Sequence, residues 1–397
     1  MKKLALLTCS LLILTGCSDP TATSETPTAS PSATASPAEV EAIPEEQEPE
    51  LFLPIPPALE EPVTWENLTE RLDELPEILF NDVKLTVERN KALADYKVDY
   101  QVYRGPNLPD KNYAELDSWL DDLFAFYGNS YKPDSEIFLI FPYEDLEWAV
   151  QQLSEPEINH PGYEDIIRGA NQSPQDQGSR QNTVPDNVPG QYSGIWSLGT
   201  TLWSQGSALT LELTEKAMIN HEYGHQAQQA QWYRDDLNGP GRGMTKSMPC
   251  WIMEGVPVTV ELAMTHDNFE GFKKNRMGRN LYLTPPLDDP LANRTEGGRV
   301  TEKVDYDYAL NYLAKSSEIN TGCEQDLYYG LGYSLGYLAT EALTALQGAE
   351  SPMALFQWVA SGMSWSEAFE GIYGISWDEA MPILAKVIEV NAVGLPR

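Results

Sequence analysis

The segment NHEYGHQ, residues 220–226, constrains this chain more than any other, because it places two of only four histidines in 397 residues four positions apart. On a helix, residues four apart project from the same face, so His221 and His225 can direct two imidazole nitrogens at one metal ion. Glu222 is rotated about 100° from His221, which leaves it beside the metal and able to act on a bound water. The pattern therefore predicts a metal-binding helix that carries its own general base.

A third ligand has to come from elsewhere in the chain. Zinc suits nitrogen donors, and a catalytic zinc site commonly uses three protein ligands. Positions 228 and 231 are both glutamine, which excludes the HExxHxxGxxH arrangement. His160 and His266 are open as donors, but Glu254 in PCWIMEGVPVTVE is the better candidate. We therefore predict one Zn²⁺ held by His221, His225 and Glu254.

The segment around Glu254 resembles the gluzincin branch of the HExxH metallopeptidases, peptidase clan MA. In that branch the third ligand is the glutamate of a W-x-x-E-G segment that opens a second helix, and Trp251, Glu254 and Gly255 match it. Farther along, Tyr329 and Gly332 match a tyrosine three residues before a glycine. GMSWSEAF at 362–369 is similar to the G-x-S-x-x-E-A-F that precedes the final helix of such enzymes.

This resemblance implies both a fold and a set of roles. The fold would be α+β and zincin-like, with a small mixed sheet and the HExxH helix followed by a mainly helical C-terminal lobe. Zinc would activate a water, Glu222 would take its proton and pass it to the leaving amine, and Tyr329 would donate to the oxyanion. A protein or peptide would be the substrate, lying along a strand just before the zinc helix.

Two departures from the family pattern matter. Position 258, four after Glu254, is valine, where thermolysin-like enzymes keep a carboxylate that supports a histidine. Glu261, two helical turns after Glu254, is the candidate for that supporting role. No G-x-M-E-N segment precedes the zinc helix, and aminopeptidases use that segment to hold a free amine. Endopeptidase activity is therefore favoured over exopeptidase activity.

Residues 1–17 form an expected export signal. MKKLALLTCSLLILTGCS has two lysines, an apolar run too short to be a permanent membrane span, and then Leu14-Thr15-Gly16-Cys17. This closing pattern resembles the lipobox of bacterial lipoproteins, in which Cys17 would become the lipid-modified N-terminus. A plain secretory signal is the alternative. Either signal places the mature chain outside the cytoplasm, and the lipobox anchors it on the extracytoplasmic side of a bacterial membrane.

Residues 18–61 are rich in Thr, Ser, Pro and Glu and contain no lysine or arginine. Such a composition buries too little apolar surface to fold, so we expect a disordered tether. The whole chain carries a formal net charge of −34. This charge excludes nucleic acid and an anionic membrane surface as partners, so the lipid would hold the protein at the membrane.

Residues 62–397 are expected to form one metallopeptidase domain and to act as a monomer. An α/β lobe with the zinc helix would span about 62–240, and a helical lobe would span about 250–397. Cys250 and Cys323 are the only cysteines of this part. In an oxidising compartment they are candidates for a disulfide, with two free thiols as the alternative.

Local patterns divide the first lobe further. Apolar periodicity predicts helices at 112–128 and 144–153 around a strand at 135–142. The polar stretch at 160–190 is expected to be a long loop, either disordered or a functional flap. Residues 199–213 are expected to form one or two strands with a turn at Gly206, after which Thr214 caps the zinc helix.

These observations lead to one interpretation and two alternatives. The chain is expected to be a lipid-anchored extracytoplasmic zinc metallopeptidase. A binding or scaffolding lipoprotein that keeps the fold without turnover is one alternative, although the intact Glu222 argues against it. A zinc amide hydrolase acting on cell-wall material is the other, because a fold does not determine its substrate.

Overall fold

The computed structural model describes residues 62–392 apart from 94–95, 109–114, 159–160, 174–175, 178, 186–191, 201–210, 234–242, 281–288, 292–294, 297–298, 301–303 and 319–328. Only the backbone is described for residues 161, 176–177, 179–185, 192–200, 211–215, 233, 279–280, 295–296, 299–300 and 329. The described residues belong to one compact unit, Leu51–Arg397. The expected signal and tether, residues 1–61, lie outside the described part.

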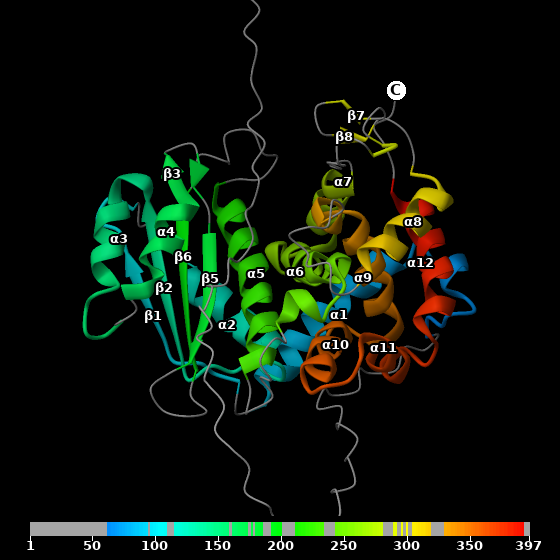
Figure 1. Cartoon of the computed structure of the whole chain (residues 1–397), viewed down its shortest axis with the longest axis horizontal. Helices are drawn as coiled ribbons and strands as arrows, with labels where there is room; N and C mark the ends of the chain where they lie inside the picture. The colour runs from blue at the N-terminus through cyan, green and yellow to red at the C-terminus, as the bar shows by residue number, and fades with distance from the viewer. Residues whose placement is uncertain are drawn as a thin grey trace, which may run out of the picture. The chain divides into compact units, whose positions relative to one another are not determined.

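Four strands form the main sheet in the order β1 (Tyr100–Arg104), β2 (Ser135–Pro142), β6 (Tyr192–Thr200) and β5 (Ser179–Pro185) (Figure 1). The first three are parallel, and β5 is antiparallel to β6 and forms an edge. In the register, Ile137 lies opposite Ile195, and Thr183 lies opposite Gly194. Two short pairs lie outside this sheet, β3 (Asn171–Ser173) with β4 (Asp176–Gln177) and β7 (Thr295–Glu296) with β8 (Arg299–Val300).

Alternate residues of β2 face two different cores. Phe138 and Ile140 join the main core with α2 (Leu116–Tyr127) and α5 (Leu211–Ala230). Ile137, Leu139 and Phe141 join a smaller core with α3 (Leu146–Gln152) and α4 (Glu164–Ala170). A parallel strand with helices on both faces needs apolar residues on both faces, which explains the uninterrupted FLIF of this strand.

After α5 the described chain is almost entirely helical. The helices are α6 (Cys250–Thr265), α7 (Phe269–Asn280), α8 (Tyr306–Ser316), α9 (Leu335–Gln347), α10 (Ser351–Ala360), α11 (Trp365–Tyr373) and α12 (Trp377–Asn391). Every residue of α6 is buried, and this helix contacts both α5 and α9. Helix α1 (Leu75–Lys91) precedes the sheet in sequence but contacts α6 and α9 as well as α2.

Short 3-10 turns connect these elements at Leu68–Glu70, Tyr143–Asp145, Pro161–Tyr163, Gln231–Tyr233, Met244–Lys246 and Tyr329–Tyr333, the last of which is labelled η10 below. In the described part of the chain, no helix is both long and apolar enough to cross a bilayer.

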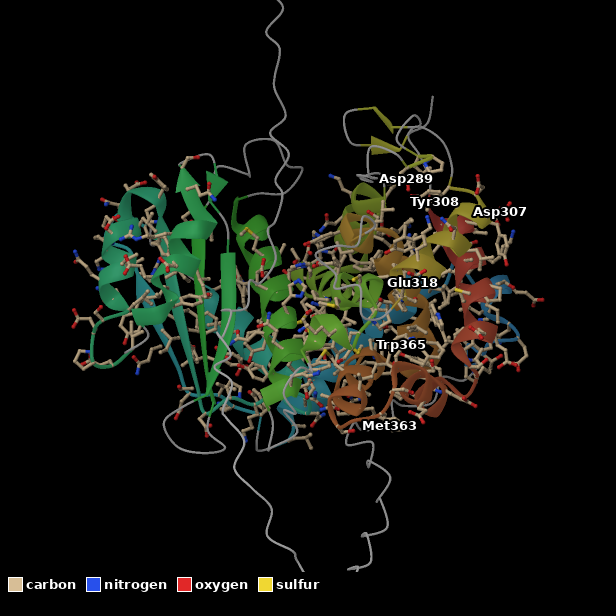
Figure 2. All side chains as sticks on the ribbon, in the orientation of Figure 1. Asp289, Asp307, Tyr308, Glu318, Met363 and Trp365 are labelled. Carbon is tan, nitrogen blue, oxygen red and sulfur yellow. The ribbon has the colours of Figure 1, made fainter. Side chains whose placement is uncertain are left out.

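Aromatic and polar contacts join the helices that follow α5. Trp251 of α6 stacks on Trp377 of α12, with ring centroids 5.4 Å apart and an interplanar angle of 13°. Trp365 of α11 meets Trp251 edge-on. Near the start of α8, Tyr308 donates a 2.8 Å hydrogen bond to Oδ2 of Asp289 (both labelled in Figure 2). The tryptophan of the WIMEG segment thus has a packing role.

The predicted α+β class and the first helix, strand and helix are confirmed. The prediction of a loop at 160–190 is wrong, because α4, β3, β4 and β5 lie there. Helix α4 buries Ile167 and Ala170. Strand β5 pairs with β6 through backbone hydrogen bonds, and such pairing does not require a periodic pattern of apolar side chains. Edge strands commonly carry polar residues, and this one gave no alternating signal.

The expected boundary before the zinc helix is also corrected. Helix α5 begins by Leu211, so residues 211–213 are helical and Thr214 lies inside the helix instead of capping it. Leucine and glutamate favour helices, and a short apolar run does not distinguish strand from helix. Residues 199–200 end strand β6, and among the described strands the sheet edge beside α5 is β5. Gly206 lies outside the described residues.

The start of β2 is tied to α5 by a buried carboxyl group. Tyr131 donates to Oε1 of Glu136 at 2.8 Å, and the Gln226 amide donates to its two oxygens at 3.2 and 3.1 Å. Burial raises the pKa of Glu136 to about 8, although both donors oppose the rise. Glu136 is therefore predominantly neutral at pH 7.

Substituting Glu136→Gln should remove a pH-dependent loss of unfolding free energy. The pKa in the unfolded chain is near 4.5 and in the folded chain about 8, so the loss is absent below the first value and complete above the second. From about pH 5 to about pH 9 the wild type should lose up to roughly 5 kcal/mol of unfolding free energy relative to the variant. Urea denaturation across this range measures the difference, and a difference independent of pH would show that Glu136 is ionised throughout.

Candidate metal centre

Helix α5 presents His221 and His225 on the face that lies against α6. Both side chains are nearly buried, at 8 % and 9 % exposure. The two helices approach closely because position 224 is glycine. A Cβ there would lie 2.9 Å from Tyr127 Oη and 3.1 Å from Cα of Pro257 on α6. Gly224 therefore allows α5 to come near enough for its histidines to meet a ligand on α6.

Helix α6 presents Glu254 from its second turn, fully buried. Glycines clear the space around this carboxylate. A Cβ at Gly255 would lie 2.7 Å from the carbonyl oxygen of Gly336, and one at Gly332 would lie 2.9 Å from Cβ of Glu254. The glycines of the WIMEG and YGLG segments thus permit α6, α9 and η10 to pack around the carboxylate.

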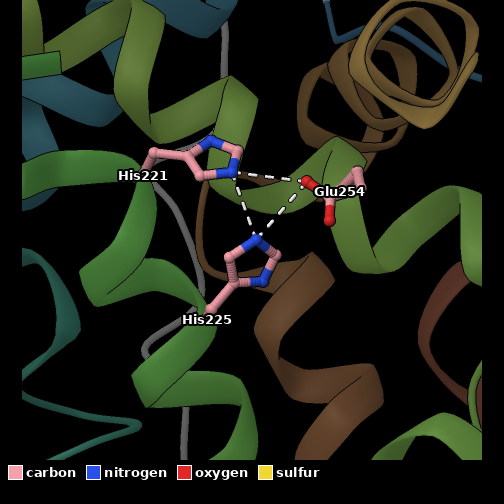
Figure 3. A group of neighbouring side chains, drawn as sticks. All are labelled: His221, His225 and Glu254. Atoms are coloured by element: carbon pink, nitrogen blue, oxygen red, sulfur yellow. Dashed lines mark hydrogen bonds and ion pairs between the residues drawn. The ribbon is translucent and has the colours of Figure 1, made fainter. Parts of the chain in front are cut away.

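Three side-chain atoms converge between the two helices (Figure 3). The Nε2 atoms of His221 and His225 are 3.1 Å apart, and Oε2 of Glu254 is 3.3 Å from the first and 3.4 Å from the second. A metal ion bound tetrahedrally at about 2.0–2.1 Å would hold its donor atoms roughly 3.3 Å apart. The separations match this requirement, so the buried group could hold a metal ion.

The partners of the two Nδ1 atoms decide which nitrogens carry protons. Nδ1 of His221 is 3.1 Å from Oε2 of Glu261, and Nδ1 of His225 is 3.1 Å from Oε1 of Gln228. Both partners are acceptors, so each Nδ1 donates, and Nε2 of each imidazole in its neutral form presents a lone pair to the centre. Two lone pairs cannot face each other at 3.1 Å unless a cation or a proton lies between them. The geometry thus favours a positively charged occupant.

The pKa values of the metal-free groups follow from the same charges. Burial alone would lower the pKa of His221, but hydrogen bonds and charge from Glu254 and Glu261 outweigh it and raise the pKa to about 10. Burial alone would raise the pKa of Glu254, yet His225 and His221 hold it well below its usual range. The site therefore attracts positive charge and keeps its carboxylate ionised.

Glu222 lies next to the ligands without joining them. It is only partly buried, whereas the three converging residues are almost inaccessible. Within the described part of the chain no hydrogen bond or ion pair involves its carboxylate. Helix geometry turns it about 100° from His221, as the sequence predicted.

A tyrosine that the sequence reasoning missed lies at the centre. Tyr333, at the end of η10, stacks on the His221 imidazole with ring centroids 5.5 Å apart and an interplanar angle of 13°. Tyr329, the predicted oxyanion donor, begins the same turn, but only its backbone is described. Spacing alone could not single out Tyr333 in a segment that also contains Tyr328 and Tyr337.

The remaining predicted residues fall in three groups. His266 follows α6 directly, twelve residues after Glu254 and so about 18 Å along the helix, which excludes it as a ligand. Cys250 is disulfide-bonded. Its predicted partner Cys323, together with His160 and the lipobox Cys17, lies outside the described residues.

Comparison with known proteins adds no assignment. No family model matches the chain, and neither a curated protein nor a solved structure matches it. The function therefore has to be inferred from the sequence and from the geometry of the site.

Proposed function

We propose that His221, His225 and Glu254 bind one zinc ion. The observation that supports this most directly is the convergence of the two Nε2 atoms with a carboxylate oxygen of Glu254. Two imidazoles and a carboxylate are common zinc ligands, and three protein ligands leave a coordination position open for chemistry. Zinc, when bound, supplies a Lewis acid that polarises a carbonyl and lowers the pKa of a water toward neutrality.

Glu222 is the proposed general base and acid. Its carboxylate would accept a proton from the attacking water and return that proton to the leaving amine as the peptide C–N bond breaks. This role needs a group beside the ligands, accessible to solvent and without a structural partner. Among the described residues next to the three ligands, the partly exposed Glu222 meets that need.

The substrate is proposed to be a protein or peptide that extends along β5. Among the described strands β5 is an edge of the main sheet, and it contacts α5, the helix that carries His221 and His225. An extended peptide can add to such an edge through main-chain hydrogen bonds. The polar sequence SRQNTVP would then leave recognition mainly to the backbone and to neighbouring pockets.

These parts are consistent with a gluzincin-type metallopeptidase of the zincin fold. A small mixed sheet, HExxH on α5, WIMEG on α6 and a helical second half follow the order that the resemblance implies. The chain lacks G-x-M-E-N before the zinc helix, so endopeptidase activity is proposed. The signal at 1–17 supports a lipid anchor at Cys17 on the extracytoplasmic side, and the mass of the mature N-terminal peptide would test it.

Two tyrosines are proposed as alternative donors to the oxyanion. Tyr329 has the spacing of the family pattern, whereas Tyr333 stacks on a ligand histidine. Replacing each tyrosine in turn with phenylalanine removes one hydroxyl and keeps the ring. The true donor should lose about 10²- to 10³-fold in kcat, and the other should lose far less. Equal, small losses in both variants would leave neither tyrosine as the donor.

Glu222→Gln should separate metal binding from turnover. Because Glu222 is not a ligand, the variant should keep full zinc content while hydrolysis of a mixed peptide library falls by about 10²- to 10⁴-fold. Metal analysis and mass spectrometry of the peptides measure the two quantities. Glu270→Gln, an exposed glutamate on α7, is the control and should match the wild type.

Two different outcomes would contradict the proposed function. A chain that binds zinc but cleaves no peptide in a Glu222-dependent manner would be a binding lipoprotein or would act on another bond, such as an amide of cell-wall material. A chain that binds no zinc would have no metal centre of the kind proposed.

A further inference from the structure

One glutamine side chain connects the two helices that carry the ligands. Gln228 is fully buried on α5, three residues after His225. Its Oε1 lies 3.1 Å from Nδ1 of His225, and its Nε2 donates a 3.1 Å hydrogen bond to the backbone carbonyl of Met253. Met253 directly precedes Glu254, so a single amide touches one ligand and the backbone beside another.

The carbonyl of Met253 lacks its usual helical donor because of a proline. In a regular helix it would accept from the N–H of residue 257, four positions later. Residue 257 is proline, inside α6, and has no N–H. The Gln228 amide donates a hydrogen bond to this carbonyl, and a buried carbonyl gains from such a donor. Pro257 also contacts Gly224 of α5, so it lies at the same helix–helix contact.

The carbonyl of Met253 determines which way the amide points. A carbonyl oxygen only accepts, so the nitrogen end of Gln228 must face Met253 and the oxygen end must face His225. That oxygen requires a proton on Nδ1 of His225, which leaves Nε2 unprotonated and directed at the centre. With the amide reversed, two oxygens would face each other at Met253.

We propose that Pro257 and Gln228 act together as a positioning pair that fixes the tautomer and orientation of His225 for metal binding. His221 has a different support, the carboxylate of Glu261. One ligand is therefore held by a charged group and the other by a neutral amide that also donates to the carbonyl from which Pro257 withholds a helical N–H. The inference rests on the proposed zinc site for its consequence, although the link between Gln228 and Pro257 is a property of the metal-free chain.

The full chain with Gln228→Met tests the effect on the metal. Methionine matches glutamine in length but has neither hydrogen bond to offer. Zinc affinity, measured by competition with a chromophoric chelator, should fall about 10- to 100-fold. The absorption bands of the Co²⁺-loaded protein should also shift, because the geometry of a ligand changes. Gln228→Glu, which retains an acceptor for Nδ1, should recover part of the affinity.

Gln231→Met is the matched control. Gln231 is equally buried, and its amide donates to the carbonyls of Ser130 and Ala227 without touching a ligand. This variant should lose comparable thermal stability but keep the zinc affinity and the Co²⁺ spectrum of the wild type. Equal losses of affinity in the two methionine variants, or an unchanged affinity in Gln228→Met, would overturn the positioning role.

A double-mutant cycle on the metal-free chain tests the pair itself. Pro257→Ala restores the N–H that Met253 lacks, so removing the Gln228 amide should lower the melting temperature less in that background than in the wild type. Strictly additive shifts would refute the link. If the wild type bound no zinc, the proposed function would be refuted, but the double-mutant cycle would still test the link between Gln228 and Pro257.

Discussion

The close contact between α5 and α6 is the interaction on which the site depends. His221 and His225 come from one helix and Glu254 from the other, and their three atoms lie within 3.1–3.4 Å of one another. Such distances require backbones nearer than ordinary side chains allow, and the contact of Gly224 with Pro257 provides that approach. Gly255 and Gly332 allow α9 and η10 to pack closely against the same helix.

A second constraint is that the centre consists of polar groups in an apolar core. Buried polar groups are costly unless each has a partner. Glu261 and Gln228 satisfy the outer nitrogens of the two histidines, and the Gln228 amide also donates to the Met253 carbonyl. On its sheet side, α5 is joined to Glu136 through Gln226. On the inward face, two nitrogens and a carboxylate oxygen converge on one place.

The sequence predicted the inner residues well because their spacing is local. HExxH fixes three side chains on one helix, and the seven-residue step from Glu254 to Glu261 keeps both near that helix. Features set by tertiary contact were missed. Gln228 could have been recognised only with the knowledge that Met253, whose carbonyl Pro257 leaves open, lies beside it. Tyr333 could not be distinguished from the neighbouring tyrosines by spacing. Strand β5 could not be predicted because backbone pairing at a sheet edge leaves no hydrophobic pattern in the sequence.

The binding of zinc by His221, His225 and Glu254 can be tested directly. Zinc K-edge X-ray absorption on the purified full chain reports the ligand atoms around the metal. The predicted spectrum has only nitrogen and oxygen neighbours at about 2.0–2.1 Å, with outer scattering from two imidazoles. A sulfur shell near 2.3 Å, scattering from fewer than two imidazoles, or no zinc edge in protein supplied with zinc would contradict the assignment to His221, His225 and Glu254.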